Sequence, residues 1–205
     1  MRTMANVTSI TRGLRVRTEG LTIVIFALCM MASYLTIVAP ILAGAGAPGP
    51  GPGPGGHRPP PTQFFLSRAA PLVWYAIAAV TTIAIWRSAA LSFQTGLSSG
   101  RLVAVFVGWL ALFAVLVTVL GVIEGSPREW HLLAWGVVIG LFATLNPLRF
   151  TKQGRVAAGA IAAVALLTAA YAFTADLGGR DLGFLTGVAV GLPGLVGGLW
   201  LMFRG

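Results

Sequence analysis

The sequence predicts an all-α integral membrane protein, a polytopic bundle of about six transmembrane helices with both termini in the cytoplasm. Three features of composition lead to this class. Hydrophobic residues make up 57% of the 205 residues, charged residues make up only 9%, and the mean hydropathy is +0.87. An average soluble domain is about 25% charged, so this chain has too few charges for a soluble surface. Intrinsic disorder is also excluded, because it requires low hydrophobicity.

Six apolar runs are candidates to cross a bilayer, for which a helix needs about 20 residues. Their cores contain no Asp, Glu, Lys or Arg, and none alternates between apolar and polar residues as the strands of a membrane barrel do. A basic cytoplasmic segment, 1–20, precedes the first run, and the last five runs form a five-helix membrane bundle within 64–205. The predicted spans are 21–42, 70–86, 102–123, 130–148, 156–175 and 182–203.

The distribution of charge predicts the orientation, because segments rich in Lys and Arg resist translocation and stay in the cytoplasm. With the N-terminus inside, ten basic residues fall on the inner side and four on the outer side. The inner set is Arg2, Arg12, Arg15, Arg17, Arg87, Arg101, Arg149, Lys152, Arg155 and Arg204. Four of the five acids, Glu124, Glu129, Asp176 and Asp181, fall outside, and only Glu19 falls inside. The net charge of +9 is therefore a topology signal, and we expect no nucleic-acid partner.

The first span has a second interpretation. A basic start, an apolar run and the Ala-Gly-Ala at 43–45 resemble a secretory signal with its cleavage site. The apolar run of 21–42 is longer than the 7–15 residues usual in a signal, which favours an uncleaved signal anchor. Cleavage would leave five spans with the same sidedness.

A Pro/Gly-rich external loop, 43–63, follows the first span. Its proline–glycine alternation excludes a collagen repeat, which needs glycine at every third position. Proline also removes backbone donors, so we expect an extended coil. The loop is interpreted as a spacer, with docking to a proline-binding groove as the alternative.

Glycines of the last span form the most specific pattern in the chain. At 100° per residue, all six fall within about 120° of arc, and glycine lets helix backbones approach closely in lipid. The helix-packing residues predicted from this and from the fourth span are Gly183, Gly187, Gly191, Gly194 and Gly198, with Gly136 and Gly140, and Gly197 is the sixth glycine of the same arc. We expect Pro193 to kink the last helix. These glycines pack either within one bundle or against another protein or a second copy.

The predicted function is that of a non-enzymatic accessory, scaffold or assembly subunit in the cell (plasma) membrane. Its partners would be the lipid bilayer and a membrane protein or a second copy of the chain. The alternative is a small oligomeric transporter or channel, with a pathway where the last helix breaks near Pro193. Spans without ionisable residues count against coupling to protons.

Little in the sequence points to catalysis. No cofactor or metal is expected, because no motif matches a known site. A mixture of acidic, basic and histidine side chains occurs only at the predicted outer rim, around His131, Glu124 and Asp181, where they are interpreted as solvated loop charges. A membrane-embedded enzyme using these loops is the third hypothesis. Trp86, Trp130 and Trp200 lie near predicted span ends and suit an aromatic belt.

Overall fold

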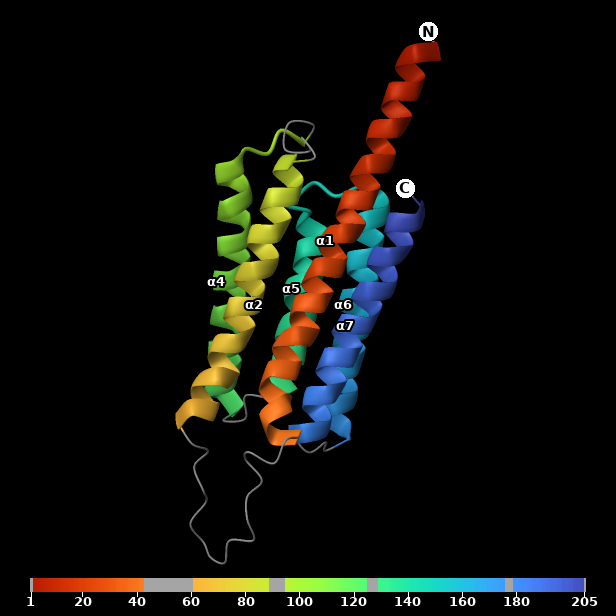
Figure 1. Ribbon diagram of the computed structural model, residues 1–205. Helices are drawn as coiled ribbons and strands as arrows, with labels where there is room; N and C mark the ends of the chain where they lie inside the picture. Colours follow the sequence, from red (N-terminus) through yellow and green to blue (C-terminus); the bar gives the residue numbers. More distant parts are fainter. Residues whose placement is uncertain (1, 43–60, 89–94, 125–128, 176–178, 205) are drawn as a thin grey trace, which may run out of the picture.

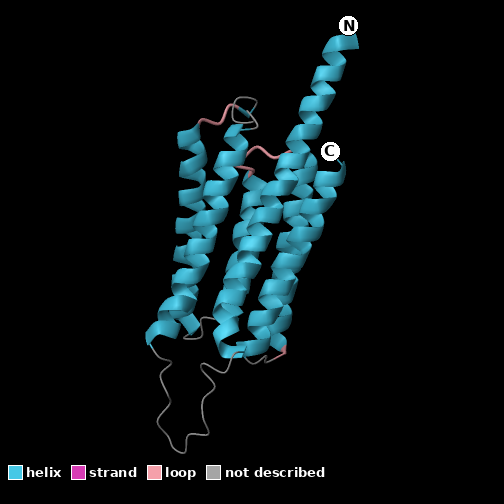
Figure 2. Cartoon of the chain, in the orientation of Figure 1, coloured by secondary structure: helices cyan, strands magenta, loops and turns pink. Residues whose placement is uncertain are grey.

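The computed structural model describes residues 2–42, 61–88, 95–124, 129–175 and 179–204, and the described residues are all helical or in short loops (Figures 1 and 2). The helices are α1 (Arg2–Leu42), α2 (Pro61–Ser88), α4 (Ser99–Glu124), α5 (Glu129–Leu145), α6 (Lys152–Thr174) and α7 (Gly179–Arg204). The all-helical class predicted from composition is confirmed for these residues. The Pro/Gly-rich segment lies outside them, except for its last three residues, which belong to α2.

Four helices are long and apolar enough to cross a membrane within the described residues. These stretches are Thr11–Ser33, Ser99–Leu116, Lys152–Thr174 and Gly187–Arg204, and two shorter apolar helices run over Leu72–Ser88 and Leu133–Leu145. The length and hydropathy of these helices are those of a helical membrane protein. The shorter pair belongs to α2 and α5, where the sequence also predicts spans.

The six helices pack side by side in a closed ring. Around it, α1 contacts α2, α2 contacts α4, α4 contacts α5, α5 contacts α6, α6 contacts α7, and α7 returns to α1. Successive helices run in opposite directions, so the N-terminus of α1 and the C-terminus of α7 lie toward the same end of the bundle (Figure 1). The α1–α7 contact is the most extensive, and α4 contacts its neighbours least.

Helix α1 begins 19 residues before the predicted first span, and its first turns extend beyond the other helices (Figure 1). The predicted basic segment is therefore helical from Arg2 onward, and part of it packs in the bundle. Its residues Val16, Thr18, Glu19 and Gly20 are buried. The apolar pattern does not reveal this, because arginines interrupt it, although Arg12 and Arg17 remain exposed beside the packed face.

Three clusters of buried side chains form the core, the smallest of them Val16, Ala157 and Leu201. An aromatic cluster joins α2, α4 and the α5–α6 loop, with Trp86, Phe106 and Phe150 buried together. A second cluster consists mainly of small residues of α6 and α7, including Ala165, Ala169 and Ala189. Ile23 of α1 packs against both. Large rings therefore separate the helices on one side of the bundle, and alanines allow them to approach on the other.

Candidate functional site

The glycines of α7 face α1 within the same chain. A Cβ at Gly198 would lie 2.7 Å from the backbone oxygen of Gly20, and a Cβ at Gly194 would lie 2.8 Å from the Cβ of Ala27. A Cβ at Gly191 would lie 2.5 Å from Met31. These distances leave no room for a side chain, so this part of the glycine pattern is already occupied inside the bundle.

The other predicted packing glycines contact different helices. A Cβ at Gly136 would lie 2.7 Å from Leu166, and one at Gly140 or Gly197 would make only ordinary contact with alanines of α6. Gly187 is buried. Gly183 lies in α7, but its surroundings are outside the described residues. The spacing predicted a packing face, and the structure identifies α1 as its neighbour at three positions.

Helix α7 continues through Pro193 without interruption. Residues 191–194 are helical on both sides of the proline, so no unwound segment is present there. The transporter alternative requires a broken helix at this point, and α7 is continuous there.

The most unusual side chain in the described part of the chain is Glu19, which is fully buried (0% exposed) on α1. Burying a carboxylate is costly unless it is paired and hydrogen-bonded. The backbone N–H of Thr151 donates to Glu19 Oε1 at 2.8 Å, and the Thr151 hydroxyl donates to Glu19 Oε2 at 2.6 Å. Arg15, one turn earlier on α1, places its Nε 3.4 Å from Oε1. Contacts with Thr151 and Arg15 therefore offset the cost of burying the Glu19 carboxylate.

Thr151 is also the N-cap of α6, which explains why it can hold the carboxylate. Its Oγ1 accepts the Gly154 N–H at 3.3 Å while the hydroxyl donates to Glu19. The free N–H groups at a helix N-terminus favour a negative charge. A Cβ at Gly154 would lie 2.5 Å from Glu19 Oε2. The glycine thus leaves the space that the carboxylate fills.

The α5–α6 loop is held in the shape that presents Thr151. Asn146 and Arg149 have positive φ values of 48° and 54°, and the Asn146 side chain bonds both backbone polar groups of Phe150. Arg149 Nη1 donates to the backbone oxygen of Thr95 at 2.6 Å, which ties this loop to the α2–α4 connection. Arg15 Nη2 donates to the Arg149 carbonyl oxygen.

The aromatic-belt prediction is wrong for Trp86. This side chain is completely buried, donates its Nε1 hydrogen to Thr22 Oγ1 at 2.9 Å, and stacks on Phe150 with ring centroids 6.0 Å apart. A nearby hydroxyl satisfies the indole inside the bundle, as buried Trp requires. Trp200 is exposed and lies beneath the Arg204 guanidinium. The surroundings of Trp130 are outside the described residues.

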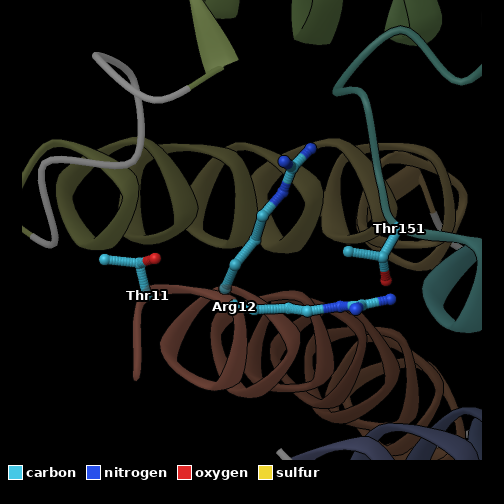
Figure 3. A pocket seen from close by; sticks show the side chains of 4 residues that line it. Thr11, Arg12 and Thr151 are labelled. Atoms are coloured by element: carbon cyan, nitrogen blue, oxygen red, sulfur yellow. The ribbon is translucent and has the colours of Figure 1, made fainter. Parts of the chain in front are cut away.

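A pocket opens beside this polar cluster. It is lined by Thr11, Arg12 and Arg15 of α1 and by Thr151, with a volume of about 320 Å³ (Figure 3). The predicted outer-rim cluster cannot be compared with it, because the side chains of Glu124, His131 and Asp181 are among those not described. Among the described residues, no three His, Cys, Asp or Glu side chains gather to hold a metal.

A second feature missed by sequence reasoning is the exposed face of α4. The predicted third span is rich in Val, Leu and Phe, yet small residues form one stripe on its outer side. Gly100 and Gly108 have open space where a Cβ would be, and Ala104 and Ala111 are exposed. At 100° per residue the four fall within about 80° of arc. Their spacing of four, four and three residues is the signal in the sequence that could have identified the stripe.

Comparisons with family models, with curated proteins and with solved structures found no match for this chain.

Proposed function

We propose that this protein is a six-span membrane protein of the plasma membrane with both termini in the cytoplasm, and that it serves as a non-enzymatic accessory or assembly subunit. The partner is a transmembrane helix of another protein, and it docks on the exposed small-residue face of α4. This face, formed by Gly100, Ala104, Gly108 and Ala111, is the observation that carries the proposal.

The reasoning starts from the forces that join helices in lipid. Apolar side chains gain little from leaving lipid for another apolar surface, so helix association depends on close backbone approach and dispersion contacts. Large side chains prevent that approach, and small residues four apart permit it. The α7 glycines facing α1 are already used in this way inside the chain, whereas the α4 stripe is uncovered.

The position of α4 in the bundle supports the same interpretation. It has the fewest contacts with its neighbours and is the least buried of the four long candidate spans. Exposed valines, such as Val103, Val107 and Val115, flank the small residues. At 100° per residue, Val103 and Val107 lie along one side of the small residues, where they form a ridge against which a second helix can pack.

The test is native mass spectrometry of the protein extracted in mild detergent. The wild type is expected at a mass above that of the 21.3 kDa monomer, and Gly108→Leu is expected to return it to the monomer. Because a side chain at Gly108 meets open space, this variant should fold normally. Ala84→Leu makes a comparable addition on the exposed face of α2 and should keep the complex.

Three outcomes separate the alternatives. A wild-type protein recovered only as a monomer contradicts the proposal. A complex that survives Gly108→Leu places the interface elsewhere and also contradicts it. A mass that is an integer multiple of the monomer identifies the partner as a second copy of the chain and replaces the heteromeric proposal with a homo-oligomer.

A further inference from the structure

The pocket lined by Thr11, Arg12, Arg15 and Thr151 lies where α1 passes the start of α6 (Figure 3). Its volume of about 320 Å³ falls at the lower end of the range for small-ligand sites, about 300–1,000 Å³. Two of its four lining residues are arginines, and they stand three positions apart on one helix. Residues at this spacing lie on the same face of a helix, so both side chains leave α1 from the face that borders the pocket.

Positive charge dominates the surroundings of this pocket. The nearest acid among the described residues, Glu19, is fully buried, and both its oxygens accept hydrogen bonds from Thr151. Lys152 and Arg155 follow Thr151 in the first turn of α6, and both are exposed. The Glu19 carboxylate is thus occupied by hydrogen bonds from Thr151, and the exposed charged residues beside the pocket, Lys152 and Arg155, are basic.

The arginines also have hydrogen-bond donors available. A guanidinium carries five N–H donors. Arg15 uses Nη2 on the Arg149 carbonyl oxygen, and its buried Nε pairs with Glu19 at 3.4 Å, so the donors open to a ligand are mainly those of Arg12. Arg12 is exposed, and no hydrogen bond or ion pair among the described residues involves it. Paired donors of this planar geometry suit phosphate oxygens.

We propose that this pocket binds a phosphate group, supplied by the headgroup of an anionic phospholipid in the leaflet at this end of the bundle. Helix α6 begins at Lys152 and α7 ends at Arg204 at this end of the bundle, and the uncharged run of α1 starts at Gly20, just beyond the pocket residues. A headgroup in the pocket therefore leaves its acyl chains beside apolar helix surface, where a soluble anion would gain nothing. The proposal rests on the membrane location inferred above, but not on the α4 interface.

The experiment measures lipid binding to the detergent-extracted full chain by native mass spectrometry, with phosphatidylglycerol or phosphatidylcholine added in parallel. The wild type is expected to retain phosphatidylglycerol in preference to phosphatidylcholine. Arg12→Gln is expected to weaken phosphatidylglycerol binding about fivefold, the change that corresponds to about 1 kcal/mol for one basic residue at a membrane surface. Arg12→Lys keeps the charge without the planar fork and should give an intermediate value.

Arg17→Gln is the matched control, because it removes the same charge from the same helix at an exposed residue that does not line the pocket. It should leave lipid binding unchanged. Equal weakening by Arg12→Gln and Arg17→Gln would mean general electrostatic attraction and would overturn the site. A wild type with no preference for phosphatidylglycerol over phosphatidylcholine would overturn it as well. Arg12 lies outside the Glu19 contacts, so the variant should fold, and its thermal unfolding would be recorded alongside.

A parallel arm with inorganic phosphate identifies the source of the ligand. If millimolar phosphate fails to displace phosphatidylglycerol from the wild type, the lipid is the ligand, as proposed. Displacement that Arg12→Gln abolishes would keep the phosphate site but overturn the lipid as its source. A protein that is monomeric yet retains phosphatidylglycerol would refute the α4 interface and leave this inference standing.

Discussion

The Glu19 carboxylate joins three parts of the chain at one point. It lies on α1, it accepts two hydrogen bonds from the residue that caps α6, and its ion-pair partner Arg15 also bonds the α5–α6 loop at Arg149. Removing one partner from a buried charged contact costs far more than the net gain of forming it, because the remaining groups stay desolvated. The arrangement therefore specifies how α1 sits against α6 more than it adds stability.

We predict that Glu19→Ala lowers the free energy of unfolding by about 3 kcal/mol, since it leaves the Thr151 N–H and hydroxyl without acceptors. Glu19→Gln should cost about half as much, because the amide oxygen can still accept the Thr151 N–H while the charge is lost. The measurement is thermal or denaturant unfolding in detergent, followed by circular dichroism. Equal stability of Glu19→Ala and the wild type would contradict this prediction and show that the Glu19–Thr151 contact does not stabilise the fold.

The contact between α1 and α7 depends on the absence of side chains. Gly20 and Gly198 bring the two backbones together, and Gly194 receives Ala27 one turn further along. In lipid this close approach is the main source of attraction between helices. Substituting a larger residue at these positions should force the helices apart, whereas the outward side of α7 should tolerate the same change.

We therefore predict that Gly194→Leu destabilises the monomer by about 1–3 kcal/mol or more, the usual cost of overpacking a tight contact. Val196→Leu also enlarges α7, but at an exposed position, and should melt like the wild type. The readout is the midpoint of thermal unfolding in detergent. If Gly194→Leu instead kept the wild-type midpoint and only lost a bound partner, the glycine face would be an intermolecular surface.

The sequence predicts where the helices lie along the chain, but not which helices pack against one another. Spacing can place Gly191 and Gly194 on one face, yet it carries no information about which helix meets that face. The sequence places Glu19 in a cytoplasmic segment because it precedes the apolar run, whereas its burial depends on a loop whose residues Asn146 and Arg149 adopt positive φ. That backbone conformation is rare for arginine and leaves no periodic signal in the sequence. The burial of Trp86 is unpredictable for a related reason, since its hydrogen-bond partner Thr22 lies on another helix.

At the scale of the whole molecule, the alternating directions of the helices bring most of the basic residues to one end. Helices α2 and α7 end there, α4 and α6 begin there, and α1 passes through it (Figure 1). The basic residues assigned to these helix ends and the α5–α6 loop are Arg87, Arg101, Arg149, Lys152, Arg155 and Arg204. The charge asymmetry that suggested an inside end in the sequence thus coincides with a spatial end of the bundle.

The final prediction concerns orientation in the membrane. It can be tested by cysteine labelling, because the chain has a single native cysteine, Cys29, which one substitution removes. In a Cys29→Ser background, we expect Ser98→Cys, an exposed position between α2 and α4, to react with a membrane-impermeant maleimide only after the cells are permeabilised. Gly53→Cys, in the predicted external loop, should react in intact cells. The reason is that segments rich in Lys and Arg are retained in the cytoplasm. The Cys29→Ser parent serves as the unlabelled control, and permeabilised cells establish that both cysteines can react. Labelling of Ser98→Cys but not Gly53→Cys in intact cells would invert the topology, and it would also move the proposed phosphate pocket to the outer leaflet.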